Sequence, residues 1–165
     1  MKIGVLAVQG AFIEHEHIIE KIGHEVVEIR QKKDLDGIDG IILPGGESTV
    51  QGQLLRKLDM LATIKSLIAD GLPTLATCAG LILLAGHIDN DDSVHIGTLP
   101  VTVKRNAYGR QLGSFVRTAP MKGFDEFPMI FIRAPYISSI KDNVDVLAAV
   151  NDRIVAVQYL SLIHI

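Results

Sequence analysis

The chain is poor in aromatic residues, in cysteine and in clustered positive charge. Phe, Trp and Tyr together make up 5% of the 165 residues and tryptophan is absent, so the core must be built from aliphatic side chains. The formal net charge is −3 and no block of Lys and Arg stands out, so the electrostatic footprint of a nucleic-acid-binding protein is missing. We therefore expect no nucleic-acid partner.

Cysteine occurs once, at Cys78, so the chain cannot form an internal disulfide. A single cysteine fits a reducing compartment, and we expect a cytoplasmic protein. The first apolar run, residues 3–8, ends at Gln9-Gly10 and is too short for a signal-peptide core or a membrane span. We accordingly expect no interaction with a membrane.

Strands and helices alternate in the first half of the sequence. Buried strands are predicted at residues 3–8, 25–29, 40–43 and 73–77, with helices over 11–22, from 48 onward and over 59–69. The first helix is expected to turn one apolar side inward, formed mostly by Phe12, Ile18, Ile19 and Ile22. This alternation is typical of βαβ units and a parallel sheet.

The second half is rich in strands, joined by short turns such as Asn151-Asp152, which is typical of a hairpin. The strands are predicted at residues 99–104, 114–118, 129–133, 144–150 and 153–157. Taken together, the pattern predicts a single α/β domain with a flavodoxin-like, three-layer open sheet. That sheet is mostly parallel, with antiparallel strands in the second half.

Two loops follow predicted parallel strands, at the sheet edge where α/β proteins bind ligands. The first is LPGGEST, residues 43–49, whose glycine N–H groups and following helix can hold a negative charge or a polarised carbonyl. Glu47 could pair with an ammonium group, and Ser48 could bond a carboxylate or cap the helix. A tight turn with an N-cap explains the same residues, and the motif alone favours that explanation.

The second loop is ATCAG, residues 76–80, which has the small-x-nucleophile-x-small pattern of a nucleophile elbow. Small flanking residues suit a sharp turn between strand and helix, and the N–H of Ala79 would face a developing oxyanion. A helix N-terminus lowers the pKa of a thiol. A buried structural cysteine is the alternative, and the small residues on both sides favour the nucleophile.

A thiolate nucleophile normally needs a nearby base. Five histidines, His15, His17, His24, His87 and His95, are predicted to lie at the surface. The sixth, His164, is followed by no carboxylate. The residues by themselves supply no convincing partner for Cys78.

Five segments, in order, resemble the glutaminase subunit of pyridoxal 5'-phosphate synthase, within the class I (triad-type) glutamine amidotransferases. They are VLAVQGA (5–11), LPGGEST (43–49), TCAGLI (77–82), RNAYGRQ (105–111) and FIRAP (131–135). The resemblance implies hydrolysis of L-glutamine to glutamate and ammonia through a thioester on Cys78. It implies delivery of ammonia to a (β/α)8-barrel synthase subunit in vitamin B6 biosynthesis, without cofactor or metal.

The resemblance also implies the roles of other residues. The backbone N–H groups of Gly46 and Ala79 would form the oxyanion hole. L-Glutamine would be bound by Gly46, Glu47, Ser48, Arg105, Ile132 and Arg133. An arginine suits the α-carboxylate of the substrate through a two-pronged hydrogen bond.

The sequence departs from the family at two places. Ala76 stands where the family commonly has glycine, a change we expect to be tolerated. The family places a further strand, His-Pro-Glu and a helix after the strand at 153–157, and His164 does not match that histidine. Residues 160–165 correspond to an in-frame translation of a transposon-end sequencing adapter. We expect an amidotransferase domain over 1–159, truncated at its C-terminus and inactive as written, followed by an adapter scar at 160–165.

Two alternatives remain open. One is another α/β cysteine amidohydrolase, or an amidotransferase subunit of another pathway. The other is a non-catalytic partner that regulates the synthase. The elbow at Cys78 argues against the second, since a docking module does not need one.

Overall fold

The structure, a computed structural model, describes residues 1–105, 115–132 and 134–164. The first half contains β1 (Lys2–Leu6), α1 (Ile13–Lys21), β2 (Glu25–Ile29), the 3-10 helix η1 (Lys32–Leu35), β3 (Gly40–Leu43), α2 (Ser48–Lys57), α3 (Leu61–Ala69), β4 (Thr74–Ala76) and α4 (Ala79–Leu84). The second contains β5 (Ala85–Ile88), β6 (Leu99–Lys104), β7 (Phe115–Met121), β8 (Phe124–Phe131), β9 (Tyr136–Ile140), β10 (Asp145–Val150), β11 (Arg153–Tyr159) and β12 (Leu162–His164). The predicted alternation of strands and helices is confirmed.

One large sheet dominates the described residues, in the order β2-β1-β3-β4-β12-β11-β9-β6-β5, with β10 paired to β11. The strands from β2 to β12 pair in parallel, whereas β11 is antiparallel to β12, β9 and β10. The first five strands follow the doubly wound order in which ligands bind where the strand order reverses. The prediction of a mostly parallel α/β sheet with later antiparallel strands is confirmed.

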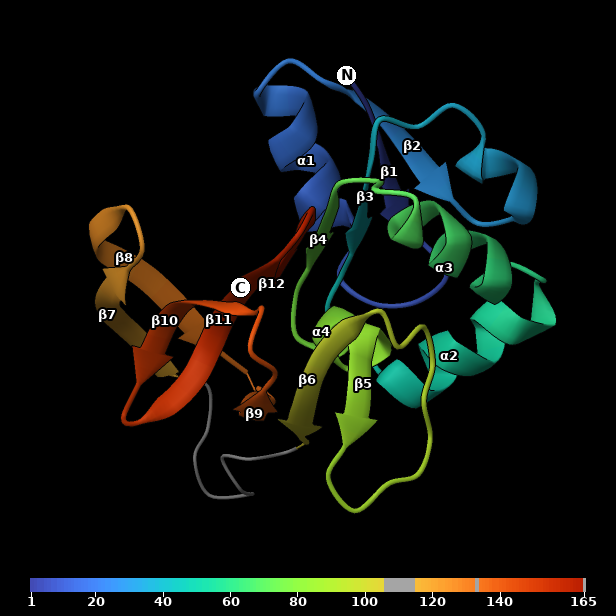
Figure 1. The fold of residues 1–165 in the computed structure, drawn as a ribbon. Helices are drawn as coiled ribbons and strands as arrows, with labels where there is room; N and C mark the ends of the chain where they lie inside the picture. The colour runs from blue at the N-terminus through green and yellow to red at the C-terminus, as the bar shows by residue number, and fades with distance from the viewer. Residues whose placement is uncertain (106–114, 133, 165) are drawn as a thin grey trace.

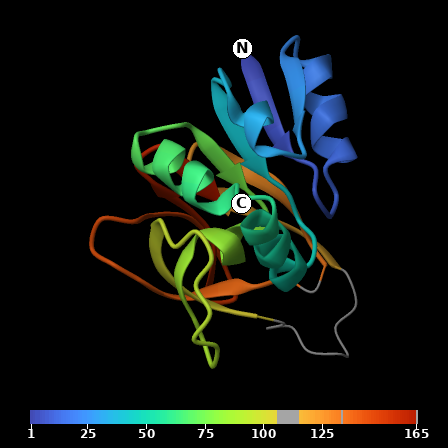
Figure 2. The ribbon, with the colours of Figure 1, turned by 90° about the vertical axis from the view of Figure 1, so that its right-hand side faces the viewer.

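Helices cover both faces of the parallel part (Figure 1). Side chains alternate between the faces, as the strand period of two requires. On one face Val5 and Ile42 pack with Ile19 of α1. On the other, Leu6 and Leu43 belong to the cluster beneath α2 and α3. Figure 2 is turned so that this second face points toward the viewer.

Helix α1 buries less of its surface than the apolar pattern predicted. Ile19 is buried, but Ile18 is 58% exposed and Ile22 is 62% exposed. The predicted inward side is therefore correct for Phe12 and Ile19 and wrong for Ile18 and Ile22. The helix has only nine residues and packs over β1 and β2 at one end of the sheet, so a single narrow stripe reaches the core.

The second half adds strands that the sequence pattern did not predict: β5, β9 and β12. The hairpin between β10 and β11 is confirmed, with Asn151 at φ 50° and Asp152 at φ 60°, as a type I′ turn requires. β7 and β8 form a separate two-stranded sheet that encloses a second apolar cluster with β10 and β11. In the described part of the chain, no helix is long and apolar enough to cross a membrane.

Candidate active site

The loops that follow β1, β3 and β4 meet at the carboxyl edge of the parallel sheet. The backbone N–H of Glu47 donates to Gln9 Oε1 at 2.8 Å, which joins the first two loops. The N–H of Thr77 donates to the carbonyl of Leu43 at 3.0 Å, which joins the last two. Because neighbouring parallel strands end at the same edge, Cys78 lies beside the Gly-Gly loop, as the sequence predicted.

Cys78 occupies a strained backbone position at the turn between β4 and α4. Its φ is 48° and its ψ is −101°, a combination that is unfavourable for a residue with a β-carbon. A β-carbon placed on Gly45 would lie 3.5 Å from the β-carbon of Cys78, so the two loops are in contact here. The predicted sharp turn is thus present, and it presents Cys78 to the Gly-Gly loop.

The pKa of Cys78 differs from the sequence-based expectation. Burial raises the pKa of the thiol, and the backbone N–H of Ala79, directed at the sulfur, lowers it by less. The expected lowering by the helix N-terminus is therefore wrong for this structure. Helix α4 has only six residues, and removing the thiolate from water outweighs the single N–H that faces it.

Glu47 caps helix α2. Its carboxylate accepts hydrogen bonds from the N–H groups of Thr49 at 3.2 Å and Val50 at 2.8 Å. Burial would raise the pKa of Glu47, but these bonds outweigh it and hold the pKa below its usual range. The cap is thus Glu47, and Ser48 is the first helical residue, which leaves the Ser48 hydroxyl free for the contact with Arg105 described below.

Gln51 ties the loops together and was not singled out in the sequence. It is fully buried in α2, and its Nε2 donates to the carbonyls of Gln9 at 2.9 Å and Pro44 at 3.3 Å. One amide thereby satisfies two loop carbonyls that lie far apart in the sequence. A polar residue one turn into an amphipathic helix carries no sequence signal for such a role.

Arg105 follows β6 and contacts the segment after β3, although the two are far apart in the sequence. Its Nη2 donates to Ser48 Oγ at 3.0 Å, so two of the predicted glutamine-binding residues meet. Ile132 follows β8 and is 61% exposed. Arg133 and residues 106–111 lie outside the described residues. The nucleophile role of Cys78, the oxyanion hole and all the glutamine-binding roles remain predictions.

The prediction that His15 and His95 lie at the surface is wrong, and His164, for which no burial was predicted, is buried as well. His15 is half-buried in α1, with Nε2 3.4 Å from Thr77 Oγ1, beside Cys78. His95 is buried against Gly52. His164 is fully enclosed at the end of β12, where Nδ1 donates to the carbonyl of Ala76 at 2.9 Å. Burial lowers the pKa of all three, that of His164 to about 4.

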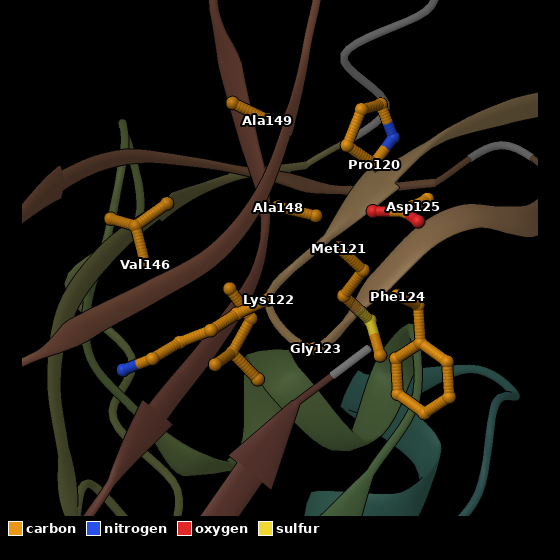
Figure 3. A pocket seen from close by; sticks show the side chains of 10 residues that line it. Pro120, Met121, Lys122, Gly123, Phe124, Asp125, Val146, Ala148 and Ala149 are labelled. Atoms are coloured by element: carbon orange, nitrogen blue, oxygen red, sulfur yellow. The ribbon is translucent and has the colours of Figure 1, made fainter.

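A cavity of about 770 Å³ lies elsewhere, between the β7–β8 hairpin and β10. Figure 3 shows its lining, which includes Met121, Phe124 and Val146 and none of the predicted site residues. Among the described residues, no group of three or more His, Cys, Asp or Glu side chains is placed to hold a metal ion. The cavity is therefore separate from the loops around Cys78.

Comparison with known proteins identifies the family of the chain. The model of the SNO glutamine amidotransferase family matches residues 5–164. The chain belongs to this family. It is 57% identical over 160 residues to pyridoxal 5'-phosphate synthase subunit PdxT of Desulfitobacterium hafniense (strain DSM 10664 / DCB-2), covering 96% of this chain and 80% of that protein. It is 54% identical over 162 residues to PdxT of Haemophilus influenzae (strain PittEE), covering 96% and 84%.

Solved structures agree with the fold of this glutamine amidotransferase. A crystal structure described as that of a glutamine amidotransferase superposes with a TM-score of 0.93 at 37% identity, covering 98% of this chain and 87% of that one. The structure of PurLQS from Thermotoga maritima has a TM-score of 0.67 at 18% identity, covering 98% and 84%. At that identity the second likeness concerns the fold alone.

Proposed function

We propose that this protein hydrolyses L-glutamine to L-glutamate and ammonia with Cys78 as the nucleophile. The observation that carries the proposal is the strained backbone of Cys78, held between β4 and α4 against Gly45. A non-glycine residue persists in such a conformation only where its surroundings impose it, and such strain gathers at active sites.

The reaction proceeds in two steps. The Cys78 sulfur bonds to the side-chain amide carbon of glutamine, the carbon–nitrogen bond breaks, and the leaving nitrogen takes the proton that the thiol gives up and departs as ammonia. Water then cleaves the thioester, releasing glutamate and restoring the thiol. The N–H groups of Gly46 and Ala79 hold the negative oxygen that develops in each step.

The substrate lies along the loop after β3. Arg105 binds the α-carboxylate, and Gly46, Glu47 and Ser48 line the same side. The resemblance implies further glutamine contacts for Ile132 and Arg133. The contact between Arg105 Nη2 and Ser48 Oγ supports this arrangement, because it holds a planar guanidinium beside the loop.

The ammonia passes to a pyridoxal 5'-phosphate synthase subunit with a (β/α)8-barrel fold. The names of the relatives, which are subunits of that synthase, support this partner. The complex acts in the cytoplasm, an environment that suits a chain with one unpaired cysteine.

Active-site labelling tests the nucleophile. The chain is incubated with 6-diazo-5-oxo-L-norleucine, a reactive analogue of glutamine, and the labelled residue is located by mass spectrometry. We expect one label, on Cys78, that L-glutamine prevents and D-glutamine does not. The Cys78→Ser variant should take up none. Labelling that L-glutamine leaves unchanged would contradict a glutamine site.

A reconstituted assay tests the partner. The synthase subunit is supplied with its phosphorylated sugar substrates and either L-glutamine or an ammonium salt. A requirement for this chain only when glutamine is the nitrogen source would support the proposal, and would overturn the expectation that the chain is inactive as written. Equal formation of pyridoxal 5'-phosphate from glutamine with the unaltered chain and with Cys78→Ser would instead favour a non-catalytic, regulatory role.

A further inference from the structure

Arg105 is held from two sides. Besides the Ser48 contact, its Nη1 forms an ion pair with Asp91 Oδ2 at 3.0 Å. The two charged side chains are only 26% and 31% exposed, so the pair is partly shielded from water. Asp91 lies in the loop between β5 and β6, and no part of the sequence motif around Arg105 points to it.

Asp91 is itself fixed by its own loop. Its N–H donates to the carbonyl of Ile88 at 3.2 Å, which closes a tight turn through Asn90 at φ 59°. Its Oδ1 accepts the N–H of Ser93 at 2.8 Å. The two carboxylate oxygens therefore have separate tasks, since Oδ1 secures the turn and Oδ2 faces the guanidinium. The Ser93 bonds and the Arg105 charge lower the pKa of Asp91 and keep it ionised.

Asp91, fixed in its turn, contacts the long side chain of Arg105, which in turn contacts Ser48, the first residue of α2. An arginine loses rotamer entropy when it is immobilised, so an arginine already held in place binds its ligand more tightly. A guanidinium has five N–H donors, so contacts with Asp91 and Ser48 leave others for a substrate carboxylate.

We propose that Asp91 is a positioning residue that orients Arg105 for the α-carboxylate of L-glutamine. The inference rests on the proposed function, in which Arg105 binds that carboxylate. Asp91 touches no substrate and acts only through the guanidinium. Its loss should therefore weaken the recognition of the carboxylate and leave the recognition of the rest of the ligand intact.

Ligand binding to a chain carrying Cys78→Ser, which prevents turnover, tests the proposal. Isothermal titration calorimetry compares L-glutamine with L-glutaminamide, which lacks the α-carboxylate. Asp91→Asn removes the charge and keeps an acceptor for the Ser93 N–H. The matched control is Asp92→Asn, which removes the same charge from the neighbouring exposed residue.

We expect Asp91→Asn to weaken L-glutamine binding about five-fold, with no change for L-glutaminamide and none for Asp92→Asn with either ligand. Equal weakening of both ligands would indicate a structural role and overturn the proposal. Unchanged or tighter L-glutamine binding would also overturn it, since tighter binding would mean that Asp91 competes with the substrate.

Two further controls keep the outcomes distinct. If the Cys78→Ser chain binds L-glutamine normally but Asp91→Asn and Asp92→Asn behave alike, the positioning role fails and the proposed function stands. If that chain binds no L-glutamine, both fail. Should Asp91→Asn not fold, Asp91→Ser carries the same test, because its hydroxyl can still accept the Ser93 N–H without a charge.

Discussion

Gly80 in α4 packs directly onto the backbone of Leu43 at the end of β3. A β-carbon at Gly80 would overlap the Leu43 carbonyl oxygen and come within 3.0 Å of its carbonyl carbon. Glycine at position 80, two residues after Cys78, is therefore required by the close approach of β3. This close approach sets how near the nucleophile turn can come to the Gly-Gly loop.

Replacing Gly80 with alanine should destabilise the fold. The new methyl group meets backbone atoms that cannot move aside, and we expect a loss of about 3 kcal/mol in the free energy of unfolding, measured by urea titration. Gly23→Ala is the control, since no atom lies within 4 Å of its β-carbon and only its φ of 83° opposes the change. That variant should lose about 1 kcal/mol. Equal losses would show that the Leu43 contact is unimportant.

Replacing Gln51 with leucine should also destabilise the fold. The change leaves the carbonyls of Gln9 and Pro44 without their buried donor, at a cost of about 1–3 kcal/mol. The exposed Gln53 in the same helix provides a matched control, and Gln53→Leu should change the free energy of unfolding by less than about 0.5 kcal/mol. If both variants unfold at the same urea concentration, the amide does not hold the loops.

The reactivity of Cys78 should rise at a higher pH in the folded chain than in the unfolded chain. Burial disfavours the thiolate and raises the pKa of the thiol, so the thiolate forms only at higher pH than in an unfolded chain. We expect the rate of alkylation by iodoacetamide to reach half its maximum at higher pH in the folded chain than in urea. A folded-state midpoint at or below that in urea would show that the N–H of Ala79 outweighs burial.

Stability should fall as the solution is acidified, partly through His164. Its pKa is lowered by burial to about 4, from an ordinary 6.5, so the neutral ring is the form that the fold accepts. Its contribution is complete above pH 6.5 and is lost as pH falls from there toward 4, with a total of about 3 kcal/mol.

The variant His164→Leu checks that contribution through urea titrations across this pH range. We expect a shallower fall in stability than in the unaltered chain. Part of the slope should remain, because burial also lowers the pKa values of His15 and His95, with the same sign. An unchanged slope would mean that His164 is not buried as a neutral ring.

Much of the parallel sheet was predictable from local sequence. The strands at 25–29, 40–43 and 99–104 have the predicted bounds. The strand at 40–43 is a short apolar run, and the other two are rich in β-branched residues. β5, β9 and β12 were missed, because their stability comes from pairing with β6, β11 and β4. A pairing partner elsewhere in the chain leaves no mark on the residues of the strand itself.

The candidate site was predictable where it consists of one continuous motif. It was not predictable where residues from separate elements come together. The small residues around Cys78 predicted its turn, because only small side chains fit there. The exposure of His15 and His95 was predicted wrongly, since an isolated histidine in a polar segment looks like a surface residue. Their burial comes from Thr77 and Gly52, on other elements.

The sequence by itself determined the aliphatic α/β sheet, the two loops at its carboxyl edge and the elbow that presents Cys78. These depend on residues adjacent in the chain, whose size and hydrogen-bonding groups restrict the local backbone. Only the tertiary structure decided that Asp91 holds Arg105 against Ser48 and that Gln51 joins two loops. It also decided that burial raises the pKa of Cys78. Those properties arise from groups that are distant in the sequence and meet only when the sheet and its helices pack.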